Sequence, residues 1–166
     1  MKTTVLGAGS WGTTLALVLL ENGHSVNLWT YKPVQAELMR EKRENPAFLP
    51  GIYLPPALNI MTDIEEAAGD RDLIVAAVPS QFLRSVIQKI EDLDLEETVI
   101  CNVAKGIENV TLMTMSEVLL DVLKHEKKEN IAILSGPSHA EEVCRKLPTA
   151  IVSAAYKLKV AKFIQD

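Results

Sequence analysis

Cysteine is scarce in this 166-residue sequence, which contains only Cys101 and Cys144. Two cysteines so far apart, without the short paired spacing of a metal site, indicate neither a disulfide framework nor a zinc module. We interpret both as small core residues and expect reduced thiols, the usual state in the cytoplasm. The first expected strand begins almost at the N-terminus, so we predict no signal peptide before it.

Long hydrophobic runs and an excess of basic residues are also missing. The longest apolar stretch, Leu15 to Leu20, is far shorter than the ~20 residues that span a bilayer, so we expect no membrane insertion. Lys and Arg number 17 against 22 Asp and Glu, which gives a net charge of −5 and argues against nucleic acid as a partner. We find no internal repeat, no Ser/His/Asp constellation and no cluster of metal ligands in the sequence.

The most informative feature is a glycine-rich turn between an expected strand and an expected helix. The β-branched and apolar run 3–6 leads into Gly-Ala-Gly-Ser-Trp-Gly, and a helix-forming stretch, 13–20, follows. In this context the pattern G-x-G-x-x-G predicts dinucleotide binding. Gly7 permits the tight turn, Gly9 lets a pyrophosphate approach the backbone, and Gly12 lets the helix pack close to the strand. The free N–H groups at the start of the helix then face the phosphates.

Strands and helices are expected to alternate along the rest of the chain. Apolar and β-branched runs predict strands at 25–29, 59–61, 72–78, 98–103, 131–134 and 149–153. Helical patterns are expected at 33–43, from 62, and at 81–90, 111–125, 140–145 and 156–165. The segment 45–56, with four prolines and several apolar residues, is expected to be a packed loop. This alternation predicts an α/β fold of Rossmann type, with a doubly wound, mainly parallel sheet and helices on both faces.

Three of the expected strands end in polar or glycine-rich residues, where such a sheet binds its ligands. These exits are 78–81, 104–108 and 135–141. Lys105 could present its ammonium group to an anionic substrate or a carbonyl oxygen, although a surface lysine is the simpler interpretation from spacing alone. Gly136 and Ser138 could donate to a phosphate, and an ordinary turn is an equally open interpretation. We interpret Glu108 and Glu141 as simply solvated surface residues. His139 could act as an acid or base, although a capping or surface role is the simpler interpretation.

The end of the second expected strand bears on the choice of cofactor. NAD-specific folds usually place an acidic residue there, on the ribose hydroxyls. The sequence has Trp29-Thr30-Tyr31-Lys32 at this position, with a cation in place of the acid. We therefore hypothesise that an NADP-type cofactor is accepted.

Six short blocks, taken together in their order and spacing, resemble the N-terminal domain of bacterial NAD(P)-dependent glycerol-3-phosphate dehydrogenases. The blocks are Gly7–Thr13, Asn45-Pro46 with Phe48–Gly51, Val78–Gln81, Ala104–Glu108, Ser135–Ser138 and Leu147–Ala150. The family reduces dihydroxyacetone phosphate to sn-glycerol 3-phosphate, a precursor of phospholipids. The resemblance implies that residues 1–166 form one dinucleotide-binding domain.

The resemblance also implies roles for individual residues. Together with the glycine pattern it implies cofactor contacts at Gly7, Gly9, Ser10, Trp11, Gly12, Tyr31, Lys32, Phe48, Pro79, Lys105 and Ala140. It implies substrate contacts at Lys105, Gly136 and Ser138. In the family, the lysine that donates the proton lies in a helical C-terminal domain, which would follow Asp166. We therefore expect the chain to bind NADP or NAD and to turn over dihydroxyacetone phosphate poorly. A homodimer is a possible assembly, and the sequence leaves the oligomeric state open.

Two other interpretations of the sequence remain open. The chain could be the first half of another two-domain reductase, such as a ketopantoate-type enzyme, although Lys105 and the phosphate-friendly turn 135–138 argue against this. It could also be a non-catalytic module that senses a nucleotide and controls a partner. A fold that no longer binds a nucleotide is hard to reconcile with the intact glycine turn.

Overall fold

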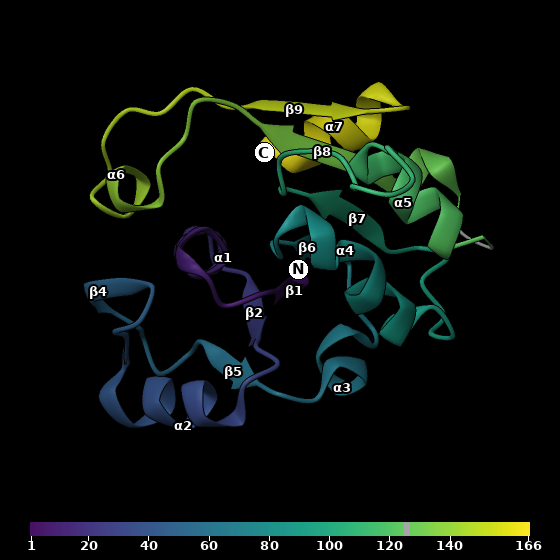
Figure 1. The fold of residues 1–166 in the computed structure, drawn as a ribbon. Coiled ribbons are helices and arrows are strands. Elements are labelled where there is room, and N and C mark those ends of the chain that lie inside the picture. Colours follow the sequence, from purple (N-terminus) through teal and green to yellow (C-terminus); the bar gives the residue numbers. More distant parts are fainter. Residues whose placement is uncertain (125–126) are drawn as a thin grey trace.

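The computed structural model describes residues 1–124 and 127–166, and its centre is a seven-stranded sheet (Figure 1). The strand order is β5-β2-β1-β6-β7-β8-β9, and the first six of these strands are parallel. Only β9 runs antiparallel, paired with β8. The strands are β1 (Lys2–Leu6), β2 (Ser25–Trp29), β5 (Asn59–Met61), β6 (Leu73–Ala76), β7 (Val99–Asn102), β8 (Ile131–Ser135) and β9 (Val152–Ala155). The prediction of a mainly parallel sheet is confirmed.

Helices cover both faces of this sheet. They are α1 (Ser10–Glu21), α2 (Pro33–Lys42), α3 (Ile64–Ala68), α4 (Ser80–Ile87), α5 (Met115–Val122), α6 (Ala140–Cys144) and α7 (Leu158–Gln165), with short 3-10 helices η1 (Gln88–Ile90) and η2 (Lys128–Asn130). Successive residues of a strand point to opposite faces, so Val5 belongs to one apolar core and Leu6 to the other. The core around Val5 contains residues of α1 and α2, and partly buried residues of α7 pack against it. The core around Leu6 contains residues of α3, α4 and α5. This arrangement is the doubly wound Rossmann-type architecture expected from the sequence.

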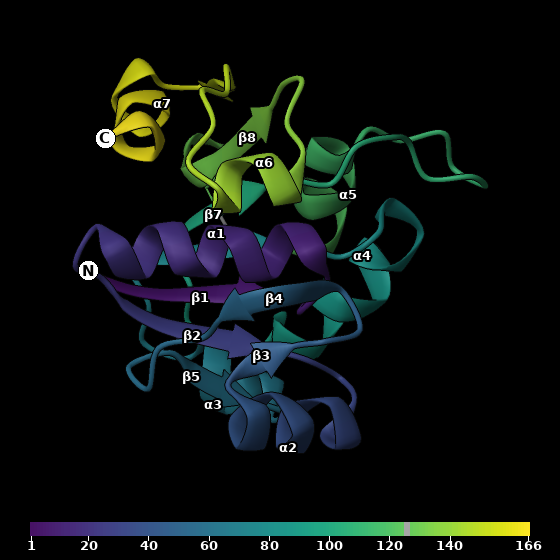
Figure 2. The same cartoon turned by 90° about the vertical axis from the view of Figure 1, so that its left-hand side faces the viewer.

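The segment 45–56 differs from the expected loop. It contains most of a two-stranded antiparallel ribbon, β3 (Glu44–Asn45) and β4 (Leu49–Tyr53), which lies between α1 and α2 (Figure 2). Prolines suggested irregular structure, but each strand of a two-stranded ribbon is an edge strand, where the missing N–H of Pro50 disturbs no ladder. Leu49 and Leu54 are buried, whereas Phe48 and Tyr53 are exposed. The expectation of a packed segment is confirmed, and that of a loop is wrong.

The helix expected at 111–125 is shorter in the structure, where α5 begins at Met115. Leu112 has a φ of 58°, which is incompatible with a right-handed helix. Thr114 then caps α5, because its hydroxyl and the Glu117 carboxylate form a reciprocal capping box. The expected end of this helix at His125 lies outside the described residues.

The order of the strands creates a crevice at the carboxyl end of β1. The chain passes from β1 to β2 and β5 on one side, and then crosses to β6, β7 and β8 on the other. Connections therefore leave β1 and β6 in opposite directions, which opens a space between them at the carboxyl edge of the sheet. The glycine-rich turn and the loops after β6 and β7 all lie at this edge.

Candidate functional site

The glycine-rich turn joins β1 to α1 by a backbone path that needs glycine at two points. Gly7 has a φ of 115°, and a Cβ atom there would lie 2.7 Å from the carbonyl oxygen of Ala77. A Cβ atom on Gly12 would lie only 1.9 Å from the carbonyl oxygen of Gly7. A Cβ atom on Gly9 would meet nothing within 4 Å. Gly7 and Gly12 thus let the helix pack against the strand, and Gly9 leaves open space at the surface of the turn.

Backbone donors at the start of α1 have no acceptor within residues 1–124 and 127–166. Among the described residues, no backbone hydrogen bond uses the N–H group of Gly9, Ser10 or Trp11, while Thr13 N–H donates to the carbonyl oxygen of Gly9 at 3.0 Å. These N–H groups lie at the positive end of a 12-residue helix. The arrangement suits a bound phosphate or diphosphate, which is acceptor-rich and negatively charged.

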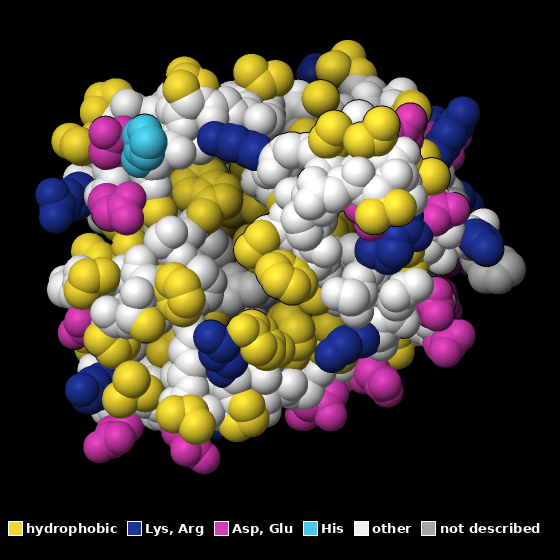
Figure 3. All heavy atoms as spheres, viewed as in Figure 1, with side chains coloured by type: hydrophobic (Ala, Val, Ile, Leu, Met, Phe, Trp, Pro, Cys, Tyr) yellow, Lys and Arg dark blue, Asp and Glu magenta, His cyan; other side chains and the backbone are white. Residues whose placement is uncertain are grey.

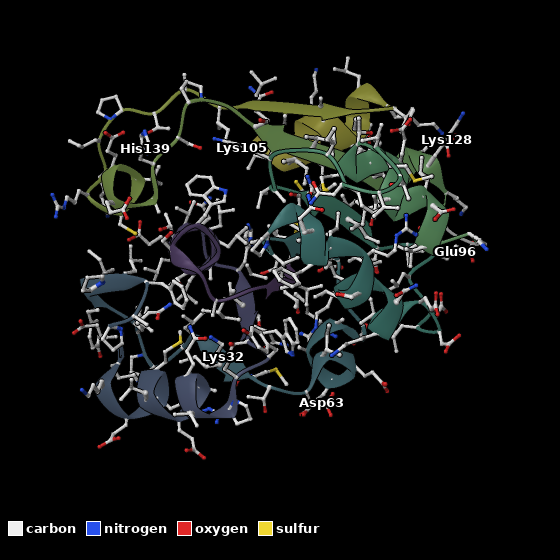
Figure 4. The ribbon with its side chains drawn as sticks, in the orientation of Figure 1. Lys32, Asp63, Glu96, Lys105, Lys128 and His139 are labelled. Carbon is white, nitrogen blue, oxygen red and sulfur yellow. The ribbon has the colours of Figure 1, made fainter. Side chains whose placement is uncertain are left out.

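The turn forms one wall of a cleft of about 860 Å³, which is large enough for a dinucleotide. Figure 3 shows this hollow with hydrophobic side chains around it and Lys or Arg side chains near its margins. Most of the predicted cofactor and substrate residues line it together: Gly7, Gly9, Ser10, Trp11, Tyr31, Lys32, Phe48, Pro79, Lys105, Ser138 and Ala140. In the view of Figure 4, Lys105 and Lys32 lie on opposite sides of α1.

Two of the predicted contact residues, Gly12 and Gly136, are not among the residues that line the cleft. Gly12 packs against the backbone of Gly7, as described above. The carbonyl oxygen of Gly136 accepts a hydrogen bond of 2.9 Å from Lys105 Nζ. A Cβ atom on Gly136 would lie 2.8 Å from the carbonyl oxygen of Ala150, so this position also requires close backbone approach. Gly136 therefore contacts a residue of the cleft, Lys105, without lining the cleft itself.

The loop that carries Lys105 is fastened on both sides. Asn102, which is buried at the end of β7, donates from Nδ2 to the carbonyl oxygen of Ala104 at 2.9 Å. The Gln81 amide, on the first turn of α4, donates to the carbonyl oxygen of Ile107 at 2.7 Å and accepts from the N–H of Asn109 at 3.0 Å. These contacts hold the backbone around Lys105 while its ammonium group stays exposed.

The interpretation of Glu108 as a simply solvated residue is wrong. Arg84 forms a two-pronged ion pair with its carboxylate, Nε to Oε1 at 2.9 Å and Nη2 to Oε2 at 3.0 Å. Hydrogen bonds from Arg84 and then from Thr111 lower the pKa of Glu108 below its ordinary value. Arg84 also pairs with Asp121 of α5. Sequence reasoning missed this link because Arg84 and Glu108 are 24 residues apart.

Sequence reasoning also missed several residues that line or support the cleft. Phe82, Ser85 and Lys89 line it from α4 and η1, at the spacing of three and four that marks one face of a helix. That spacing was visible in the sequence and was the available signal. His139 and Glu141, assigned to surface or capping roles, also line the cleft, and His139 makes no capping hydrogen bond with its side chain.

The two cysteines lie in different environments. Cys101 is buried in β7, as expected of a core residue, and burial raises the pKa of its thiol to about 12. Cys144 is only half-buried and lies with its sulfur 3.0 Å from Thr14 Oγ1, where α6 meets α1. Within residues 1–124 and 127–166 no group of three or more His, Cys, Asp or Glu could hold a metal ion. The same residues include no helix long and apolar enough to cross a membrane.

Comparison with known proteins identifies the family of this chain. The sequence model described as the N-terminus of NAD-dependent glycerol-3-phosphate dehydrogenase matches residues 2–161. The chain belongs to this family. A glycerol-3-phosphate dehydrogenase (NAD(P)+) of Chlorobium limicola is 45% identical over 166 residues, which are 100% of this chain and 50% of that protein. The corresponding protein of Agathobacter rectalis is 46% identical over 165 residues, 99% of this chain and 48% of that protein. The chain thus spans about half the length of the curated relatives it matches.

Solved structures agree with the family assignment. A glycerol-3-phosphate dehydrogenase from Coxiella burnetii superposes with a TM-score of 0.90 at 32% identity, covering 98% of this chain and 49% of that one. A putative 2-dehydropantoate 2-reductase from Enterococcus faecalis superposes with a TM-score of 0.59 at 24% identity, covering 81% of this chain and 40% of that one, and shows only a shared fold. The family is therefore that of the glycerol-3-phosphate dehydrogenases, not the ketopantoate-type reductases considered from the sequence.

Proposed function

We propose that residues 1–166 are the NAD(P)-binding domain of a glycerol-3-phosphate dehydrogenase that interconverts dihydroxyacetone phosphate and sn-glycerol 3-phosphate. The observation that carries this proposal is the cleft, where the unpartnered N–H groups of the glycine-rich turn and the Lys105 ammonium group line one continuous space. The turn fits a dinucleotide diphosphate because it presents several backbone donors without a protein acceptor. Family membership supports the same assignment.

The residues of the cleft divide the work of binding. The N–H groups of Gly9, Ser10 and Trp11 would hold the diphosphate, and Tyr31 with Lys32 would contact the adenosine end of the cofactor. Phe48, Pro79 and Ala140 supply further cofactor contacts. Bound NADPH or NADH supplies the hydride that reduces the C2 carbonyl of dihydroxyacetone phosphate.

Lys105 would hold the substrate, with help from its neighbours. Its ammonium group already lies 2.9 Å from the Gly136 carbonyl oxygen, and Ser138 lines the same space. An ammonium group there attracts a phosphate and stabilises negative charge on a substrate oxygen. We propose that the proton-donating lysine belongs to a helical second domain, as the family resemblance implies, and we assign no proton donor within residues 1–166. In this proposal the domain binds and orients, and a second segment completes the reaction.

Titration of the purified chain tests this proposal directly. We expect nicotinamide fluorescence to report saturable binding of NADPH and NADH. We expect reduction of dihydroxyacetone phosphate by residues 1–166 to stay at or near the uncatalysed rate, because the proposal assigns no proton donor among them. Turnover at an ordinary enzymatic rate would move the proton donor into this domain. A failure to bind either nucleotide would refute the assignment. Capture of a partner by only one redox form of the cofactor would instead favour the nucleotide-sensing module.

We also propose that NADPH is preferred, because Lys32 lies at the ribose end of the cleft. Glu141 is the only acidic side chain among the described residues that line the cleft, and it belongs to α6 and not to the end of β2. Lys32→Ala should weaken NADPH binding by about three- to fivefold, the effect of one exposed ion pair with the 2′-phosphate, and should change NADH binding by less than about twofold. Calorimetry at matched low salt measures both. Lys42→Ala, at the last residue of α2 and outside the cleft, is the control. Tighter binding of NADH than of NADPH by the unmodified chain would contradict the preference.

The cellular setting of the chain is a further part of the proposal. A cytoplasmic location suits the two unpaired cysteines, since neither takes part in a disulfide. A homodimer is the assembly that we propose, and sedimentation of the purified chain tests it. Neither point affects the assignment of the cleft.

A further inference from the structure

Two side-chain amides, that of Asn45 outside the cleft and that of Gln35 in its lining, donate hydrogen bonds to a single carbonyl group of the glycine-rich turn. Asn45, which is fully buried in β3, donates from Nδ2 to the carbonyl oxygen of Ala8 at 3.0 Å and to Thr13 Oγ1 at 2.8 Å. Gln35, on α2, donates from Nε2 to the same Ala8 oxygen at 2.8 Å. Thr30 Oγ1 in turn donates to Gln35 Oε1 at 2.9 Å. The Ala8 carbonyl therefore accepts two amide donors from elements outside the turn.

These contacts also set the direction of the next N–H group. The peptide bond between Ala8 and Gly9 is trans, and in a planar trans peptide the N–H points opposite to the C=O. Because Asn45 and Gln35 draw the carbonyl toward themselves, the Gly9 N–H points away from them. Gly9 lines the cleft, and its N–H has no acceptor among the described residues. In the Ala8–Gly9 peptide, the carbonyl group is thus held by two side-chain amides, and the N–H group is available to a ligand.

We propose that Asn45, assisted by Gln35, is a positioning residue for the diphosphate of the bound dinucleotide. The inference rests on the proposed function and adds a specific role for the ribbon β3–β4. Burial of an asparagine costs free energy compared with an apolar side chain of similar size unless its amide group is hydrogen-bonded. Here both donor hydrogens are used, one on the turn and one on the first part of α1. The amide couples the ribbon to the part of the cleft where the N–H groups of Gly9, Ser10 and Trp11 have no acceptor among the described residues.

Two ligands that differ only in the diphosphate isolate this role. We would measure the dissociation constants of ADP and adenosine by competition with NADPH fluorescence, for the unmodified chain and for Asn45→Leu. The ratio of the two constants reports the contribution of the diphosphate, whereas a general loss of structure weakens both ligands. We expect ADP to bind more tightly than adenosine in the unmodified chain, and we expect Asn45→Leu to reduce that advantage by about tenfold, the worth of one hydrogen bond to a charged group.

Asn27→Leu is the matched control. Asn27 is also a buried asparagine of a strand, with Nδ2 donating to the Ala67 carbonyl oxygen at 3.2 Å, but it lies outside the cleft. This variant should lose stability and keep the ratio of the unmodified chain. Gln35→Met, at a half-buried position, carries the test if Asn45→Leu does not fold, and it should reduce the ratio in the same direction.

The outcomes separate this inference from the proposed function. A ratio unchanged in a folded Asn45→Leu chain, or in Gln35→Met where Asn45→Leu does not fold, would overturn the positioning role and leave cofactor binding intact. An equal fall of the ratio in Asn27→Leu would overturn it too, because the effect would then belong to any buried asparagine. Failure of the unmodified chain to bind NADPH would refute the proposed function itself.

Discussion

Gly9→Val is expected to lower the affinity of the chain for NADPH by roughly 100-fold, because the branched side chain would occupy the space of the diphosphate. Loss of two charge-assisted hydrogen bonds of about 1.5 kcal/mol each accounts for that factor. The fold should survive, since a Cβ atom at Gly9 meets nothing within 4 Å and the residue has an extended backbone, with φ −78° and ψ −175°. Valine is a poorer helix cap than glycine, so we expect the free energy of unfolding to fall by less than about 1 kcal/mol. Nicotinamide fluorescence and thermal unfolding measure the two effects.

A smaller side chain at the same position provides the control for this prediction. Gly9→Ala adds only the Cβ atom, so it should lose about as little stability as Gly9→Val, because alanine is also a poorer helix cap than glycine, and it should lose less affinity. A graded loss from alanine to valine identifies steric exclusion as the cause. If Gly9→Val bound NADPH within threefold of the unmodified chain, the diphosphate would have to lie elsewhere in the cleft.

The sequence predicted the parts of the site that depend on neighbours along the chain. The strand, the glycine-rich turn and the helix are adjacent, and their roles follow from local geometry: Gly7 adopts a positive φ, and Gly12 abuts the backbone of Gly7. The boundaries of β2 and β5 also match the predicted strands at 25–29 and 59–61, each of which is followed by a polar residue, Thr30 and Thr62. The resemblance then selected Lys105, for which spacing alone favoured a surface role.

Contacts between distant residues could not be predicted in this way. The ion pair of Arg84 with Glu108 and the grip of Asn45 on Ala8 join segments 24 and 37 residues apart. Periodicity says which face of an element is buried, but it does not say which polar group on another element will lie opposite. The prolines of 45–56 predicted a loop because they were interpreted from local preferences alone. The ribbon β3–β4 is stabilised by burial of Asn45, Leu49 and the adjacent Leu54 against the rest of the protein. The contacts that support the site, such as those of Asn45 and Arg84, thus depend on tertiary structure and not on local sequence.

Gly12→Ala is expected to affect stability and binding together, in contrast to the substitutions at Gly9. The added Cβ atom would lie 1.9 Å from the carbonyl oxygen of Gly7 and 3.1 Å from the Cβ atom of Ala77, so α1 would have to move away from β1. Overpacking of this kind costs about 3 kcal/mol, and the higher helix preference of alanine offsets about 1 kcal/mol of that cost. We expect a net loss of about 2 kcal/mol in the free energy of unfolding, measured with urea.

Movement of α1 also displaces the N–H groups of Ser10 and Trp11, so NADPH affinity should fall by at least about tenfold even where the variant is fully folded. Gly9→Ala is the matched control, because it is the same substitution in the same turn with open space in place of backbone. A Gly12→Ala chain as stable as Gly9→Ala would mean that helix and strand can separate freely at this point. The close packing of α1 on β1 would then not be what places the phosphate-binding N–H groups, and their position would have to depend on the amides of Asn45 and Gln35 alone.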